Sequence, residues 1–211
     1  RMLNGCKVLK INIPYTIEEL CDITVEMSAR SGIKENAYLR PLAYKSEEAM
    51  GVRLHNLKAD FFAFIIPWGR YIDADKCKAG VSSWRRASSN CGLPLVKATG
   101  NYINSAFTKT EAVENGFDEA IILNQHGRVA EGSGENLFLV KDGKLLTPSI
   151  EENVLPVITR NSVIEVAKKE LGIETIERPI ERSELYMADE AFFSGTAVHI
   201  SPIAEIDHRT V

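Results

Sequence analysis

The sequence predicts a mixed α/β protein of two domains, with a smaller domain and linker over residues 1–72 and a larger domain over residues 73–211. Three observations support this prediction. Helical and strand-like patterns alternate along the 211 residues, hydrophobic and charged residues make up 45% and 26% of the chain, and breaker residues cluster near position 70. A chain of this length and composition can bury a sizeable core.

Charge and composition exclude several classes of partner. The formal net charge is −4, from 25 basic and 29 acidic side chains, which argues against nucleic acid because a binder needs a basic face. The apolar runs are shorter than the roughly 20 residues that a membrane span requires, so no membrane partner is expected. The four cysteines form no CxxC pair and the four histidines are scattered, which predicts no metal site and a reducing compartment, the cytoplasm.

The smaller domain is expected to contain one helix and two strands. Thr16 and Glu19 form a capping-box pattern, and apolar residues then recur at helical spacing up to about Gly32. Residues 37–44 and 59–66 are rich in aromatic and β-branched side chains and predict strands. The breakers that mark the expected joint are Pro67, Gly69, Asp73 and Asp75.

The larger domain is expected to open with a strand at residues 81–84 and a helix at 101–115 that Gly116 closes. Short strands connected by hairpins follow. They are predicted at residues 119–123, 128–130, 136–140 and 145–147. Asp142 and Gly143 suit a type I′ turn, and a longer turn is expected at residues 124–127.

A second long helix is predicted over residues 159–171, ending at Gly172, with short strands at 174–177 and 190–193. The side chains expected on the inner side of this helix are Val163, Val166, Ala167 and Leu171. Antiparallel hairpins are expected to dominate this half of the chain.

Lys97 has an unusual local sequence, because no charged residue lies within six positions on either side. An amine among apolar neighbours is disfavoured in its charged form, and an uncharged amine attacks carbonyl groups. A lone lysine is nevertheless most often a solvated surface charge. Lys97 is therefore a candidate nucleophile that needs support from other motifs.

Three other segments supply that support. Residues 153–160 (NVLPVITR) lead into a helix whose first amides lack intrahelical partners and favour an anion. Residues 194–197 (SGTA) are small enough for a ligand to approach the backbone, and Glu131 is followed by the glycines of EGSG at 131–134. Each segment alone reads more simply as a helix cap, a strand end or a surface hairpin. Together they predict a phosphate cradle, a carboxylate-binding amide pair and a buried acid around one amine.

These motifs occur in a characteristic order along the chain. They are AYLRPL (37–42), IPWGRY (66–71), Lys97, GNY (100–102), EGSGENLF (131–138), LPVITR (155–160) and SGTA (194–197). The set resembles the fold type IV pyridoxal-phosphate enzymes, most closely the branched-chain amino acid aminotransferases, over essentially the whole chain. The resemblance implies a smaller N-terminal α/β domain and a larger C-terminal pseudo-barrel domain. It also implies that N-terminal and C-terminal segments of the family are missing from this sequence.

The resemblance implies pyridoxal 5'-phosphate as the cofactor. Lys97 would hold it as a Schiff base and move a proton, Glu131 would lie against the pyridine nitrogen, and Tyr102 would hydrogen-bond the phenolic oxygen. The other cofactor-binding residues that it implies are Arg1, Leu155, Ile158, Thr159, Gly195 and Thr196. Val157 stands where the family carries glycine, and its Cβ would crowd the turn if the backbone there had a positive φ.

Substrate contacts follow from the same resemblance. The residues implied are Tyr38, Thr196 and Ala197 for the α-carboxylate, Arg40 and Tyr71 for the distal carboxylate of glutamate, and Trp68 and Tyr71 for the aliphatic side chain. The implied reaction transfers the amino group of leucine, isoleucine or valine to 2-oxoglutarate, in a homodimer or higher homo-oligomer.

Two alternatives remain open. A D-amino acid transaminase or aminodeoxychorismate lyase would share the fold, although Tyr38 and Arg40 within AYLRPL favour the branched-chain enzymes. A non-catalytic binding or scaffold protein could also keep the fold. The presence of Lys97, Tyr102 and Glu131 argues against that alternative.

Overall fold

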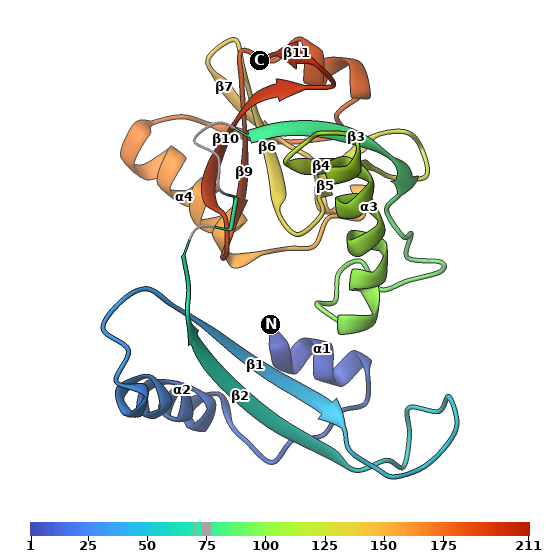
Figure 1. Ribbon diagram of the computed structural model, residues 1–211, viewed down its shortest axis with the longest axis vertical. Helices are drawn as coiled ribbons and strands as arrows, with labels where there is room; N and C mark the ends of the chain where they lie inside the picture. The colour runs from blue at the N-terminus through green and yellow to red at the C-terminus, as the bar shows by residue number, and fades with distance from the viewer. Residues whose placement is uncertain (70, 73–76) are drawn as a thin grey trace. The chain divides into compact units, whose positions relative to one another are not determined.

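The computed structural model describes residues 1–69, 71–72 and 77–211, and it confirms the mixed α/β class. The chain divides into two compact units, residues 1–70 and 71–211, which are described separately (Figure 1). Asp73 and Asp75 of the expected joint lie outside the described residues. Within the described ranges, no helix is long and apolar enough to cross a membrane.

The first unit is a two-stranded antiparallel sheet with two helices. Its elements are α1 (Met2–Val8), α2 (Ile17–Ser31), β1 (Ala37–Lys45) and β2 (Ala59–Pro67). The register runs from Ala37 opposite Pro67 to Lys45 opposite Ala59, and α2 packs on β2. The predicted helix and both strands are confirmed to within one residue at each end. Helix α1 had no prediction, since Arg1 at its N-cap makes no side-chain capping bond.

Helix α2 begins at the predicted capping box. The Glu19 amide donates to Thr16 Oγ1 over 3.2 Å, and the Thr16 amide donates to Glu19 Oε2 over 2.8 Å. The helix ends at Gly32, which has a φ of +68°, a conformation that glycine adopts without steric cost. Both helix boundaries therefore follow from local side-chain and backbone chemistry.

The second unit contains one curled sheet, two long helices and short 3-10 turns (Figure 1). Its elements are β3 (Cys77–Arg85), η1 (Thr99–Asn101), α3 (Tyr102–Glu114), β4 (Glu119–Leu123), β5 (Val129–Gly132), β6 (Asn136–Lys141), β7 (Lys144–Thr147), η2 (Ile150–Glu152), α4 (Ile158–Leu171), β8 (Thr175–Glu177), η3 (Arg182–Tyr186), β9 (Glu190–Gly195), β10 (His199–Ile206) and β11 (Arg209–Thr210). The strand order is β5-β4-β3-β10-β9-β6-β7-β8, with β11 paired to β10.

Most neighbouring strands in this sheet are antiparallel, as expected. The parallel pairs are β3 with β4, β3 with β10, and β7 with β8. The β6–β7 hairpin turns at Asp142 and Gly143, whose φ values of +50° and +71° confirm the predicted type I′ geometry. Strand β10, which joins β3 to β9, had no prediction.

The main hydrophobic core of this unit is formed by side chains of the sheet that are fully buried, among them Ile121, Leu137, Phe193 and Ile206. Helix α3 packs on β3 and β4, and α4 packs on β9 and β8. The two helices lie on opposite sides of the strands in Figure 1. Helix α4 packs on Phe138 and Phe192, which alternate along β6 and β9 with core residues such as Leu137 and Phe193, so the main core lies on the other face of the sheet.

The inner face predicted for α4 is partly wrong. Ala167 is buried, and Val163 packs against the same core cluster. Val166 and Leu171 are 53% and 67% exposed. Successive helical residues turn by about 100°, which carries Val166 away from the direction of Val163 and Ala167, and Leu171 is the last residue of the helix.

Candidate active site

A pocket lies in the second unit where the β5–β6 turn meets the start of α4. Its lining residues are Arg86, Val96, Asn101, Tyr102, Ser105, Glu131, Ser133, Gly134, Glu135, Leu155 and Val157. Three of these, Tyr102, Glu131 and Leu155, are residues expected to bind the cofactor. Others adjoin expected residues in sequence, since Val96 precedes Lys97 and Val157 precedes Ile158.

Glu131 is the most fully engaged acid of the pocket. Its Oε1 lies 2.8 Å from Nη2 of Arg86, while Oε2 accepts hydrogen bonds from the Leu155 amide (2.9 Å) and from Nδ2 of Asn136 (3.0 Å). Three donors from three separate segments thus fix the orientation of the carboxyl group. Oε1 receives one of these donors and so keeps a lone pair for a ligand.

Burial raises the pKa of Glu131 to about 7. The positive charge of Arg86 opposes this shift most strongly, followed by the Leu155 amide and the charges of Lys97 and Arg160. A cationic ring nitrogen in the pocket would further favour the ionised carboxylate. The surroundings of Glu131 therefore suit the role expected of it.

Lys97 is exposed, so the expectation of apolar surroundings for its amine is wrong. The neighbouring side chains explain the difference, because Leu93 and Leu95 are themselves 37% and 50% exposed. The amine is nevertheless directed toward the pocket. Its Nζ donates to Tyr102 Oη over 2.7 Å, and its charge acts on the pKa of Glu131.

The N-terminus of α4 offers an anion-binding backbone. The first amides of the helix, those of Ile158 and Thr159, lack an intrahelical partner because no turn precedes them. Val157 at the N-cap contributes no side-chain capping bond to them. Val157 has a φ of −99°, and its Cβ therefore does not crowd the turn. The guanidinium of Arg160, 2% exposed, donates to Pro148 O (3.0 Å) and Glu177 Oε2 (2.7 Å) and ties this helix start to β7 and β8.

The turn between β9 and β10 carries the remaining residues expected in this unit. Gly195 is the last residue of β9, Thr196 is exposed, and Ala197 is half-buried. Among the described residues, the Thr196 and Ala197 amides donate no backbone hydrogen bond. A Cβ on Gly195 would lie 3.7 Å from Cγ of Glu135, so this turn adjoins a residue of the pocket wall.

Residues expected to bind substrate also cluster in the first unit. Tyr38 and Trp68 pack with ring centroids 5.0 Å apart, and Arg40 Nη2 donates to Tyr38 Oη over 2.9 Å. Arg1, exposed at the start of α1, belongs to the same unit. Their roles toward a ligand in the second unit stay predictions.

Tyr71 belongs to the second unit, where Nζ of Lys109 lies 5.6 Å from the centroid of its ring. Lys109 is in turn held by Glu119 Oε2 at 2.8 Å. Burial is the main cause of a raised pKa for Tyr71, which favours its neutral phenol. Arg70, the charged residue of IPWGRY, lies outside the described residues.

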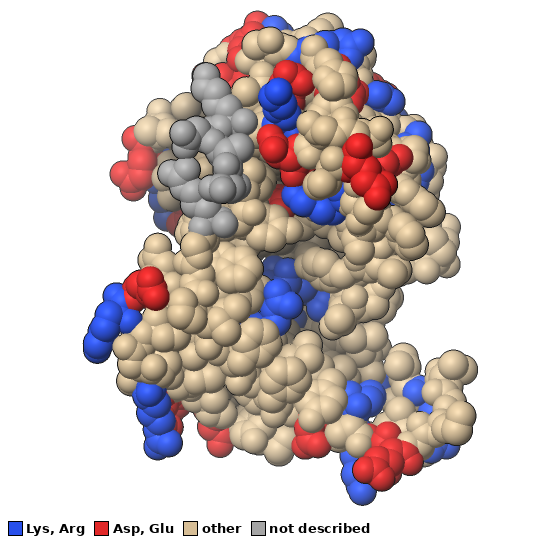
Figure 2. All heavy atoms as spheres, in the orientation of Figure 1, with Lys and Arg blue, Asp and Glu red and all other residues tan. Residues whose placement is uncertain are grey.

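Sequence reasoning missed several polar residues of the pocket region, among them Arg86, Glu135 and Asn136. Asn136 and Glu135 fall inside EGSGENLF, so their place in that motif was an available signal. Arg86 follows β3 without any motif, and only the folded chain brings it to Glu131. Acidic and basic side chains are interspersed over the face of this unit shown in Figure 2, so surface charge gives no indication of the site.

The donor set fits the expected cofactor. Uncapped amides at α4 suit a phosphate, Glu131 suits a protonated ring nitrogen, Tyr102 suits a phenolic oxygen, and Lys97 suits an aldehyde. The fold and this arrangement define a class of enzymes that use pyridoxal phosphate to transfer groups to and from amino acids.

The comparison with known sequences agrees with this class. The amino-transferase class IV family matches residues 1–206, and the chain belongs to this family. It is 47% identical over 212 aligned residues to a probable branched-chain-amino-acid aminotransferase of Aquifex aeolicus, covering all of this chain and 68% of that protein.

Solved structures give the same result. The fold matches a branched-chain aminotransferase of Thermoproteus uzoniensis with norvaline at a TM-score of 0.96 and 45% identity, covering 99% of this chain and 70% of that one. It also matches a branched-chain amino acid aminotransferase of Thermobaculum terrenum in its PLP form at a TM-score of 0.94 and 36% identity, covering 99% of this chain and 69% of that one.

Proposed function

We propose that this protein is a branched-chain amino acid aminotransferase. It uses pyridoxal 5'-phosphate to transfer the amino group of leucine, isoleucine or valine to 2-oxoglutarate, giving the branched 2-oxo acid and glutamate. The observation that carries the proposal is a pocket at the start of α4 that Tyr102 and Glu131 line, with the Lys97 amine hydrogen-bonded to Tyr102. Relatives named as branched-chain enzymes favour this activity over a D-amino acid transaminase or aminodeoxychorismate lyase.

The residues of the second unit have distinct chemical tasks. The bound cofactor supplies an electron sink for the substrate α-carbon. Lys97 is the nucleophile and carries the proton that must leave and return, while the Tyr102 hydroxyl orients its amine. Glu131, held by Arg86, keeps a negative charge against the ring nitrogen, and the amides of Ile158 and Thr159 bind the phosphate.

Other binding roles complete the proposal. The further cofactor residues are Arg1, Leu155, Gly195 and Thr196, and the substrate residues are Tyr38, Arg40, Trp68, Tyr71, Thr196 and Ala197. An apolar wall with an arginine at its edge accepts both an aliphatic side chain and a second carboxylate. The same proposal includes a domain boundary between residues 72 and 73, which separates the smaller domain from the cofactor-binding domain.

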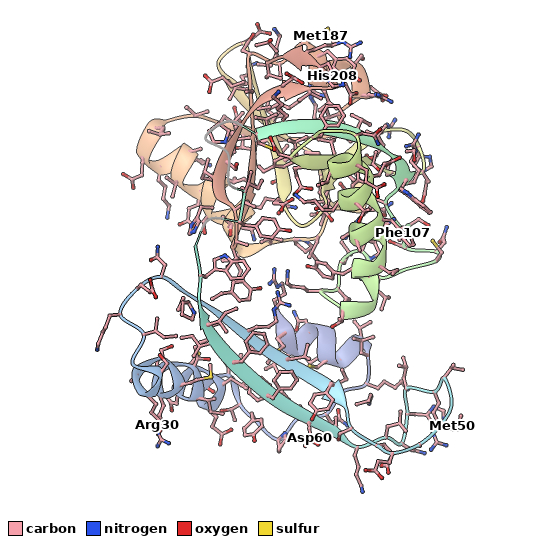
Figure 3. The ribbon with its side chains drawn as sticks, viewed as in Figure 1. Arg30, Met50, Asp60, Phe107, Met187 and His208 are labelled. Atoms are coloured by element: carbon pink, nitrogen blue, oxygen red, sulfur yellow. The ribbon has the colours of Figure 1, made fainter. Side chains whose placement is uncertain are left out.

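The protein is further proposed to act in the cytoplasm as a homodimer or higher homo-oligomer. An exposed aromatic pair, Trp84 of β3 and Phe107 of α3, supports association with a second copy. Trp84 and Phe107 are 46% and 49% exposed, and their rings stack with centroids 4.8 Å apart. Phe107 lies on the outer side of α3 in Figure 3. Large exposed aromatic side chains in contact are typical of interfaces.

The test combines covalent trapping with an assay of amino donors. Borohydride reduction of the protein incubated with cofactor should add one phosphopyridoxyl group to Lys97, read by intact mass and by identifying the modified peptide. Lys97→Ala should abolish both the label and turnover, whereas Lys168→Ala on the exposed side of α4 should change neither.

The assay separates the alternatives. L-leucine should serve as donor and D-alanine should not. Use of D-alanine instead would point to the D-amino acid enzymes, and absence of any label would support a scaffold. Normal turnover by Lys97→Ala would overturn the assignment of the nucleophile.

A further inference from the structure

Glu135 is a second acid in the wall of the pocket that the proposed chemistry does not use. It is 4% exposed and lines the pocket together with Glu131 and Gly134. Its Oε2 accepts a hydrogen bond of 3.0 Å from the Gly134 amide. A buried acid with one neutral donor has a different electrostatic situation from Glu131, which has a guanidinium and two further donors.

Glu135 lies against the backbone at two glycines, Gly132 and Gly195. A Cβ at Gly132 would come within 2.7 Å of Glu135 Oε2, and a Cβ at Gly195 within 3.7 Å of its Cγ. Neither glycine has a positive φ. At Gly132 the close approach of Glu135 and Phe193 leaves no room for a Cβ, whereas at Gly195 the distance to Glu135 is that of ordinary van der Waals contact. Glu135 therefore packs directly against the last residue of β9, next to the amides of Thr196 and Ala197.

Among the described residues, Lys109 and Arg86 are the cations that pair with the acids of this region. Three acids meet in this region, Glu119 from β4, Glu131 from β5 and Glu135 from the β5–β6 turn, and each of the first two has its own cation. Lys109 lies 2.8 Å from Glu119 and Arg86 lies 2.8 Å from Glu131. Within the described part of the chain, Glu135 forms no ion pair.

A buried carboxylate without a cation is costly, so the group holds its proton instead. Burial raises the pKa of Glu135 to about 8, the charge of Glu119 raises it next, and the Gly134 amide and Lys109 lower it. The charge of Glu135 in turn raises the pKa of Tyr71 and of Cys77. Its electrostatic effect therefore reaches β3 and the start of this unit.

We propose that Glu135 is a positioning residue that must hold its proton for the turn at Gly195, Thr196 and Ala197 to bind an anionic group. The inference rests on the proposed function, which assigns the substrate carboxylate and part of the phosphate to this turn. A neutral Glu135 leaves the amides free to attract an anion. An ionised Glu135 places a negative charge behind the turn in a region of low dielectric, where repulsion is strong.

The protonation state can be measured without cofactor or substrate. Infrared titration of the apoprotein should show a protonated carboxyl band near neutral pH, part of which is lost as the pH rises through about 8. Glu135→Gln should lack that part and keep the part that Glu131 loses through about pH 7. Glu119→Gln removes the neighbouring charge and frees Lys109, and it should move the loss of the band to lower pH. Glu152→Gln, which alters a buried acid elsewhere in the unit, should leave the band in place.

The consequence for anion binding is tested on the holoprotein with 4-methylpentanoate, which has the carbon skeleton of leucine without the titrating amine. From about pH 7 to about pH 9, calorimetry should show the affinity of the wild type falling about tenfold, as expected for a coupling of one pKa unit. Glu135→Gln should change by less than about twofold over the same interval.

An equal loss in Glu135→Gln, or a wild-type band already absent at neutral pH, would overturn the proposal. If Glu135→Gln does not fold, the pH at which the carboxyl band is lost in Glu119→Gln tests the proposal instead. None of these outcomes alters the borohydride result at Lys97, so failure of this inference is distinguishable from failure of the proposed function.

Discussion

The guanidinium of Arg86 and the carboxylate of Glu131 form an ion pair of 2.8 Å in which both side chains are only 7% exposed. Nε of Arg86 also donates to Asn153 O over 3.3 Å. Arg86 thus links the acid of β5 to the segment that leads into α4. The pair joins two parts of the pocket that are remote in sequence.

Removal of this cation should be strongly destabilising. Arg86→Met leaves Glu131 buried without its cation, and breaking such a pair costs about 3–5 kcal/mol of unfolding free energy. Urea unfolding of the apoprotein measures the loss. Arg85→Met is the matched control, because Arg85 is exposed, and it should change stability by less than about 0.5 kcal/mol. Similar losses in the two variants would contradict a special role for Arg86.

Two glycines of the EGSG motif should respond differently to alanine. A Cβ at Gly132 would meet Glu135 Oε2 at 2.7 Å and Phe193 Cε1 at 2.9 Å, whereas one at Gly134 meets nothing within 4 Å. Overpacking of this kind costs about 1–3 kcal/mol, so Gly132→Ala should lower the free energy of unfolding while Gly134→Ala leaves it nearly unchanged. Equal stability of the two variants would refute the close approach of Glu135.

The apoprotein should lose stability as the pH rises from about 5 to about 8 through its pocket acids. Burial raises the pKa of Glu131 to about 7 and that of Glu135 to about 8. A raised pKa stabilises the fold while the group is protonated and stops doing so as the pH passes the folded pKa. Each group can contribute a slope of at most about 1.4 kcal/mol per pH unit.

The contribution of Glu135 is isolated by comparison with Glu135→Gln. The difference in unfolding free energy between this variant and the wild type should depend on pH between about 5 and about 8 and become constant above about pH 8. A difference that is independent of pH would show that Glu135 is ionised in the folded protein near neutrality.

The exposed pair of Trp84 and Phe107 predicts which substitution disrupts association. Phe107→Lys should reduce the oligomer to a smaller species, because a charge replaces an exposed aromatic ring in contact with Trp84. Light scattering after size-exclusion chromatography measures the mass. Val166→Lys on α4 is the control, since Val166 is similarly exposed, and its mass should equal that of the wild type. Unchanged mass for Phe107→Lys would place the interface elsewhere.

Local chemistry explains which elements were predictable. The capping box at Thr16, the glycine end at Gly32 and the turn at Asp142 and Gly143 are each determined by neighbouring residues. Strand β10 is different, because its middle contains Pro202, which argues against a strand inside a sheet, and its partners β3 and β9 are set by the whole fold.

The site was predictable to the extent that its residues fall within motifs. Lys97, Tyr102 and Glu131 lie in such motifs, and in the structure Tyr102 and Glu131 line one pocket while Lys97 is hydrogen-bonded to Tyr102. The surroundings of Lys97 were not predictable, since apolar neighbours in sequence can point outward, as Leu95 does. Arg86 lacked any local pattern, because its importance depends on a contact with a strand far along the chain.

The parallel pairing of β3 with β10 constrains how the protein is made. The amide of Val81 in β3 donates to Oδ1 of Asp207, the residue that follows β10, and the two residues lie 126 positions apart. Until the ribosome has released β10, the neighbouring edges of β3 and β9 remain unpaired, and open strand edges promote aggregation. The two halves of the sheet are therefore joined only after β10 has been translated, and chaperones that shield strand edges would be most needed before that point.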